Sequence, residues 1–179
     1  GCLQHEGGEH INGAVSVAAG QPAADATTVN GAVDVAADAV VKEAGTINGA
    51  ITLGDRAMAD SASTVNGAIK VGAGARVGGD VSTVNGAITL QKGADVKGRL
   101  ENVNGHITLD AAHVGGGIET MQGDVTVGAG SQVGGGVTVK KSKGISLSFS
   151  DKVPVIVVGP GASVRGPLRF EREVKLYVS

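Results

Sequence analysis

The sequence predicts an all-β protein, a single-stranded right-handed parallel β-helix (β-solenoid) with three short strands in each coil of 18 to 19 residues. A tripeptide that ends in Asn-Gly recurs along most of the chain, and aliphatic residues alternate with polar ones after each copy. Glycine supplies 31 of the 179 residues and is evenly spread, which indicates repeated turns. The right hand follows from the usual crossover between parallel strands.

The amide residue of the tripeptide marks the length of each coil. Successive positions lie 18, 18, 18, 19, 19 and 18 residues apart, which is too short for a repeat built from helices. The glycine after it suits a sharp corner, and stacked amides can hydrogen-bond to one another. We therefore expect a structural corner ladder formed by Asn12, Asn30, Asn48, Asn66, Asn85, Asn104 and Gln122.

Each coil contains three segments with the alternation of half-buried strands. Residues 67–71 illustrate the first segment, 75–77 the second, which follows a glycine turn, and 80–83 the third. Equivalent strands of neighbouring coils should lie about 4.8 Å apart and run in the same direction. The pattern therefore predicts three parallel sheets around a narrow core of Val, Ile, Leu and Ala, since only 2% of the residues are aromatic.

The organisation along the chain is a tether followed by one domain. Residues 1–10 are predicted to be an N-terminal tether and residues 11–179 the solenoid, with a Lys-containing excursion at 140–153. The repeat resumes at Ile156, in the same position as Ile88 of an earlier coil. Phe170 is a candidate end cap because it is bulky and near the open end, and residues 174–178 alternate like one more strand.

Three segments share the pattern Gly-Ala-x-Val-x-Gly: residues 74–79, 93–98 and 161–166. In these segments the chain resembles the bactofilins and related polymer-forming β-helical proteins, and the similarity extends over most of residues 11–170. The resemblance implies a right-handed β-helix that joins end to end into filaments in the cytoplasm, without a nucleotide.

The start of the chain predicts a lipid anchor. It opens Gly1-Cys2-Leu3 without Met, and this junction resembles the end of a bacterial lipoprotein signal, in which the Cys becomes the lipidated first residue. Cys2 is thus the lipidation candidate, and the expected location is the bacterial periplasm or outer membrane. If Gly1 was instead added before the first native residue, a cytoplasmic location is the alternative.

Composition argues against several classes of partner. With 15 basic and 17 acidic side chains the formal charge is -2, so nucleic acid is not expected to bind. The sequence has no apolar run of 18 residues, so we expect no transmembrane helix and a membrane contact through the lipid alone. The single cysteine excludes an internal disulfide.

Two groups of side chains have the composition of metal sites, and neither is favoured. Residues 5–10 contain two His and two Glu that could hold a transition metal, but a solvated tether is the commoner explanation. His106, Asp110 and His113 should project from different faces and therefore not converge. We expect no metal and no cofactor.

The threonines before the tripeptides could form a flat hydroxyl stripe, like that of ice-binding solenoids. Asn102 interrupts this series and no Thr-x-Thr pair recurs, so the stripe is not favoured. The threonines concerned are Thr28, Thr46, Thr64, Thr83 and Thr120.

No motif for catalysis is present: the sequence lacks a Gly-x-Ser-x-Gly elbow and a phosphate loop. Hexapeptide acyltransferases share the 18-residue coil, but aliphatic steps here fall at 65, 69, 71, 77, 81 and 84, not every six residues. We expect a non-enzymatic structural or scaffold protein of the bacterial cell envelope that self-associates through solenoid ends or faces. The alternatives are a surface adhesin or glycan/protein-binding module and, third, a cytoplasmic bactofilin-like polymer.

Overall fold

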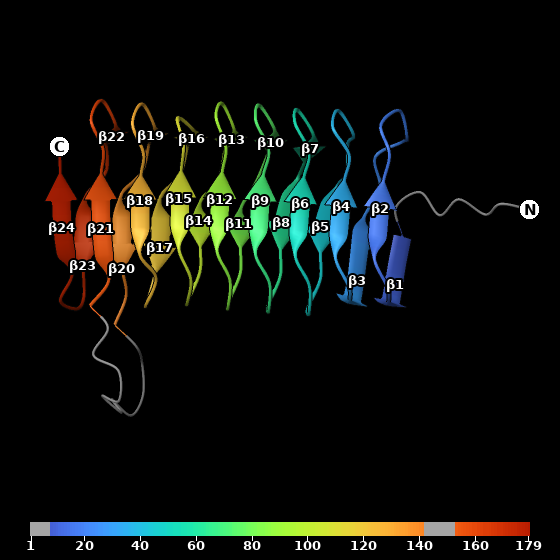
Figure 1. Ribbon diagram of the computed structural model, residues 1–179, viewed down its shortest axis with the longest axis horizontal. Helices are drawn as coiled ribbons and strands as arrows, with labels where there is room; N and C mark the ends of the chain where they lie inside the picture. Colours follow the sequence, from blue (N-terminus) through green and yellow to red (C-terminus); the bar gives the residue numbers. More distant parts are fainter. Residues whose placement is uncertain (1–7, 142–152) are drawn as a thin grey trace, which may run out of the picture.

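The protein is a parallel β-solenoid of about 8 turns, which confirms the predicted fold class. The computed structural model describes residues 8–141 and 153–179. The coils stack along one long axis, with the first coil at one end of the rod and β24 (Lys175–Val178) at the other (Figure 1). Three sheets run along the rod, and every strand pair in them is parallel.

The sheets are named A, B and C here, and their strands are given in order along the rod. Sheet A contains β1 (Gly8–Asn12), β3 (Ala26–Asn30), β5 (Glu43–Gly45), β8 (Ser61–Ser63), β11 (Val81–Ser82), β14 (Leu100–Glu101), β17 (Ile118–Thr120), β20 (Val137–Val139) and β23 (Leu168–Phe170). Sheet B contains β2 (Val15–Val17), β4 (Val33–Val35), β6 (Ile51–Leu53), β9 (Ile69–Val71), β12 (Ile88–Leu90), β15 (Ile107–Leu109), β18 (Val125–Val127), β21 (Val155–Val158) and β24. Sheet C contains β7 (Met58–Ala59), β10 (Arg76–Val77), β13 (Asp95–Val96), β16 (His113–Val114), β19 (Gln132–Val133) and β22 (Ser163–Val164).

The register stacks equivalent residues in columns. In sheet B, Ile69 pairs with Ile88 and Ile88 with Ile107, and all three side chains are fully buried. The column continues through Val125 to Ile156, so the repeat resumes after the excursion in the predicted register. The core is thus one continuous row of aliphatic side chains, because period-two alternation sends every second residue inward.

The boundaries of the solenoid differ slightly from the expected ones. β1 begins at Gly8, because residues 8–10 already pair with 26–28 of the next coil. The predicted tether therefore overlaps the first strand. Cys2 and residues 5–7 of the candidate metal segment lie outside the described residues. Most of the excursion, 142–152, also lies outside them, between β20 and β21.

The turn from sheet B to sheet C needs a left-handed backbone in each coil. Glycine takes this conformation in most coils, but Asp38, Arg56 and Ala111 take it with φ of 63°, 60° and 47°. Arg56 donates two hydrogen bonds to the Asp38 carboxylate, at 2.9 and 3.1 Å, which holds those two turns together. Ala111 has no side-chain group that could compensate, so its turn stores strain.

We therefore expect Ala111→Gly to stabilise the protein by about 0.5–1 kcal/mol, since glycine adopts this backbone without steric cost. The matched change is Gly93→Ala at the same turn of the preceding coil, where φ is 78° and the new Cβ would meet only ordinary contacts, the nearest at 3.6 Å. It should destabilise by about 1 kcal/mol. Urea unfolding followed by circular dichroism measures both; shifts of equal sign would contradict the explanation.

Candidate functional site

The Asn-Gly corner joins each strand of sheet A to the following strand of sheet B. On its outer side, the Nδ2 of each Asn donates to the Oδ1 of the Asn one coil earlier, at 2.9 to 3.1 Å. This amide ladder runs from Asn12 to Asn104. Within the described part of the chain, no side-chain hydrogen bond joins Gln122 to it.

The inner side of the corner is held by threonine. The hydroxyls of Thr28, Thr46, Thr64 and Thr83 donate to the corner glycine carbonyl of the preceding coil, at 2.8 to 3.0 Å. These side chains are at most 6% exposed. The surface hydroxyl stripe is therefore absent from these positions, because the corner carbonyls need a donor from inside.

Departures from the repeat gather in the coils around residues 101–124. One outward column of sheet A holds Ser63 and Ser82 and then changes to Glu101 and Glu119. Around the corner, the position before each sheet B strand is Ala in the earlier coils but His106 and then Asp124 here. In a repeat protein the equivalent residues of regular coils show what stacking alone requires, so a local cluster of departures marks a candidate site.

A shallow groove of about 280 Å³ lies over this part of sheet A and its corner. It is smaller than most small-molecule sites, which measure about 300–1,000 Å³. An apolar rim and three charged side chains distinguish it. We call it the carboxylate groove and define it by Val84, Val103, Met121, Glu101, Glu119 and Lys140.

The two carboxyl groups of the groove repel one another. Burial raises the pKa of Glu101, and the Glu119 carboxyl beside it raises that pKa further through a hydrogen bond and through its charge. Lys140 Nζ lies 3.1 Å from Glu119, whereas the nearest cation to Glu101, Arg99, is 3.9 Å away. The groove therefore holds two carboxylates and two nearby cations, and the closer ion pair is the one at Glu119.

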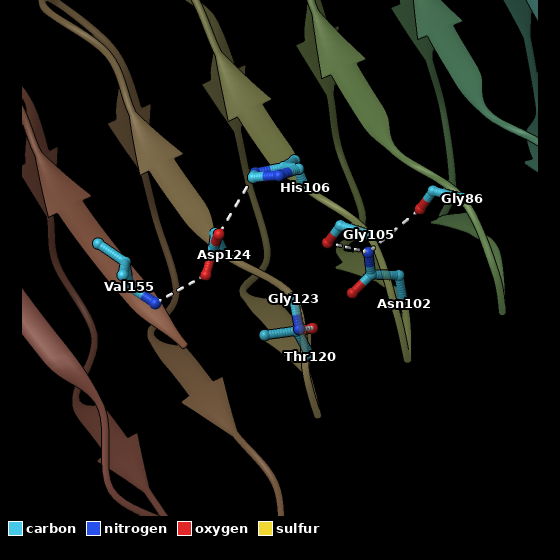
Figure 2. A network of polar contacts seen from close by, with 8 residues as sticks. All are labelled: Gly86, Asn102, Gly105, His106, Thr120, Gly123, Asp124 and Val155. Carbon is cyan, nitrogen blue, oxygen red and sulfur yellow. Dashed lines mark hydrogen bonds and ion pairs between the residues drawn. The ribbon is translucent and has the colours of Figure 1, made fainter. Parts of the chain in front are cut away.

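Asn102 lines the groove and interrupts the threonine series, and Figure 2 shows its hydrogen bonds. Its Nδ2 donates to the carbonyls of Gly86 and Gly105, at 3.3 and 2.9 Å, while its buried Oδ1 has no partner. Asn102 thereby occupies the Gly105 carbonyl, to which the hydroxyl of Thr120 would donate in a regular coil. Thr120 instead accepts a hydrogen bond from the Gly123 N–H at 3.0 Å.

The histidines considered as ligands are held apart. His106 Nδ1 lies 3.6 Å from Asp124, beside sheet B, whereas His113 Nδ1 lies 2.8 Å from Asp95 in sheet C. Across residues 8–141 and 153–179, no three His, Cys, Asp or Glu side chains are close enough to hold a metal ion. Asp124 has a structural role, because it accepts a hydrogen bond from the Val155 N–H at 2.8 Å, where the chain re-enters the stack.

Phe170, the candidate end cap, is half-buried. It pairs with Val139 and packs on the core from β23. No single motif in the sequence predicts the carboxylate groove. Its signal is present in the repeat, as the change from Ser82 to Glu101 in otherwise equivalent positions.

Comparison of the chain with protein-family models, curated proteins and solved structures gives no significant match. The bactofilin resemblance therefore depends on the Gly-Ala-x-Val-x-Gly segments alone, while the fold is established by the structure. Among the described residues there is no helix of the length and apolar character needed to cross a membrane.

The raised pKa of Glu101 predicts a pH-dependent stability. In the unfolded chain the carboxyl ionises near 4.5, whereas in the folded protein it keeps its proton to higher pH, so stability is lost as pH rises through the folded pKa. We expect Glu101→Gln to melt at a higher temperature than the wild type at about pH 7 and at the same temperature at about pH 4. Glu119→Gln is the control and should gain less, because it also loses the Lys140 pair. Melting curves that shift equally at both pH values would refute this.

Restoring threonine at the interrupted position should also stabilise the protein. In Asn102→Thr the hydroxyl can donate to the Gly86 carbonyl, as in the regular coils, and the unpaired buried oxygen is removed. We expect a gain of about 1–2 kcal/mol. The reciprocal change, Thr83→Asn, should cost a similar amount. Chemical denaturation measures both variants, and a loss of stability in Asn102→Thr would show that the orphaned oxygen has a partner.

Proposed function

We propose that this chain is a non-enzymatic structural or scaffold protein of the bacterial cell envelope, tethered by a lipid at Cys2 and able to self-associate. The observation that carries the proposal is the uninterrupted stack: one core and two sheets, A and B, continue from the first coil to the last, and sheet C joins them from β7 onward. Nearly every inward side chain serves this stacking, as expected of a rigid spacer.

The dimensions of the stack suit a spacer. At about 4.8 Å per coil, about 8 turns give a rod of roughly 40 Å. Each coil is bonded to both neighbours through backbone ladders, and the amide and threonine ladders add side-chain bonds at one corner. Bending the rod would break several of these bonds together, so the two ends stay at a fixed distance.

The second candidate is an adhesin or a module that binds a glycan or a protein. The carboxylate groove favours it, because it brings an apolar rim together with two carboxylates, of which Glu101 has its nearest cation, Arg99, 3.9 Å away. A cytoplasmic bactofilin-like polymer is the third candidate. The shared solenoid and the Gly-Ala-x-Val-x-Gly segments support it.

Lipid attachment tests the proposed location. The protein is expressed in bacteria with its native upstream sequence, and its mass is measured in the membrane fraction beside a Cys2→Ser variant. We expect a diacyl or triacyl increment that disappears in the variant, because acylation requires the thiol. An unmodified wild-type protein in the soluble fraction would contradict the envelope proposal and favour the cytoplasmic polymer.

A further inference from the structure

The corner of the solenoid repeats one chemically reactive dipeptide. Asn-Gly occurs at residues 12–13, 30–31, 48–49, 66–67, 85–86 and 104–105. In this dipeptide the backbone nitrogen of the glycine can attack the side-chain amide of the asparagine, because glycine has no Cβ to hinder the approach. The attack needs a backbone nitrogen that is free to lose its proton and an asparagine side chain that is free to turn. The hydrogen bonds at each corner therefore decide which of the six pairs can react.

The backbone N–H of the glycine is bonded in five of the six pairs. It donates to the backbone carbonyl of the Asn one coil later, at 2.8 to 3.0 Å, in the pairs that contain Gly13, Gly31, Gly49, Gly67 and Gly86. In the same register the N–H of Gly105 would face the Gln122 carbonyl. Within residues 8–141 and 153–179, however, this N–H has no hydrogen-bond partner. The backbone bridges from Asn to Asn likewise end at Asn104.

The missing bond is confined to this corner. Before the corner, the Gln122 N–H donates to the Val103 carbonyl at 2.8 Å. After it, the Ile107 N–H donates to the Asp124 carbonyl, also at 2.8 Å. The two coils therefore stay in register on both sides of Gly105, and its own N–H is left out of the ladder.

The Asn104 side chain is also held by fewer bonds than its counterparts. Each Asn from Asn30 to Asn85 takes part in two bonds of the amide ladder, because it donates to the coil before it and accepts from the coil after it. Asn104 donates to Asn85 at 3.0 Å, but within the described part of the chain its Oδ1 accepts no hydrogen bond. The residue is partly exposed, so water reaches it.

We propose that Asn104 is a site of spontaneous covalent modification, at which the asparagine is converted through a cyclic imide to a mixture of aspartate and isoaspartate. The Gly105 nitrogen forms a bond to Cγ of Asn104, the Cγ–Nδ2 bond breaks, and ammonia leaves with the proton that the attacking nitrogen gives up. Water then opens the ring at either carbonyl and supplies the oxygen of the new carboxyl group. The rate rises with pH, because the attacking nitrogen must lose its proton.

The modification changes the rod in the coils where the repeat is least regular. A carboxylate at position 104 cannot donate to Asn85, so the amide ladder loses its last bond. The isoaspartate form also adds a methylene group to the main chain between β14 and β15, at the corner where Gly105 lies close to the Gly86 carbonyl. A new negative charge follows Val103 of the carboxylate groove. This chemistry is independent of lipid attachment and of self-association.

Peptide mapping of the folded protein tests the site, with the other Asn-Gly pairs as controls within the same chain. Trypsin releases Asn48, Asn66, Asn85 and Asn104 on separate peptides, and mass spectrometry measures aspartate and isoaspartate in each after incubation at physiological pH and temperature. We expect Asn104 to react about tenfold faster or more, since the others must first release two hydrogen bonds. In denaturant the four peptides should react at similar rates. Equal rates in the folded protein would overturn the assignment.

Hydrogen exchange measures the unbonded N–H directly. We expect the amide proton of Gly105 to exchange faster than those of Gly67 and Gly86, because exchange requires an N–H that is released from its acceptor. A Gly105 proton as protected as that of Gly86 would show that this N–H is bonded in solution, and the proposal would fail.

A variant identifies the source of the new charge. The wild-type protein should accumulate an acidic form on ion exchange, and this form should be nearly absent from Asn104→Gln, because the larger ring that glutamine needs forms more slowly. An acidic form that grows at the wild-type rate in Asn104→Gln would locate the modification at another residue and overturn the proposal.

Discussion

The close approach of successive coils at the Asn-Gly corner is the constraint on which the rest of the structure depends. A Cβ on Gly49 would collide with the Gly31 carbonyl, so only glycine lets the coils stack there. The same carbonyl accepts the buried hydroxyl of Thr46, while outside it the Asn48 amide donates to Asn30. Each regular coil thus combines a corner glycine without a Cβ, a buried Thr hydroxyl that donates to the corner carbonyl and an exposed Asn amide in the ladder. Together these features fix where the flanking strands begin.

Repetition explains why so much of the fold could be predicted from the sequence. A period of 18 or 19 residues with alternation inside it requires strands, and stacking them in register fixes which residues face the core. The return of the repeat at Ile156 and the last strand, β24, were predicted on the same basis and are confirmed. Both were predictable because their short sequence patterns repeat those of earlier coils.

Side-chain roles at the corner and in the groove could not be predicted in the same way. A threonine beside an exposed Asn looks like a surface residue in the linear pattern, and only the path of the corner shows that Thr64 turns inward to a carbonyl. Similarly, Glu101 and Glu119 are 18 residues apart in sequence, and their repulsion arises only because the strands stack.

The earlier coils of the rod are regular, and the departures from the repeat lie in the later coils. The coils up to Asn85 have Thr, Gly or Ser at the position that later carries Glu101, Thr at that of Asn102 and Ala at that of Asp124. The departures at Glu101 and Asn102 cost stability, through repulsion and through an unpaired oxygen, and mutation would remove such costs if stacking were the only demand. Because these departures are concentrated in the coils around residues 101–124, this part of the rod is where the partner contacts of the proposed function are expected. If Cys2 carries the lipid, the tether lies at the opposite end, so these contacts are held away from the membrane.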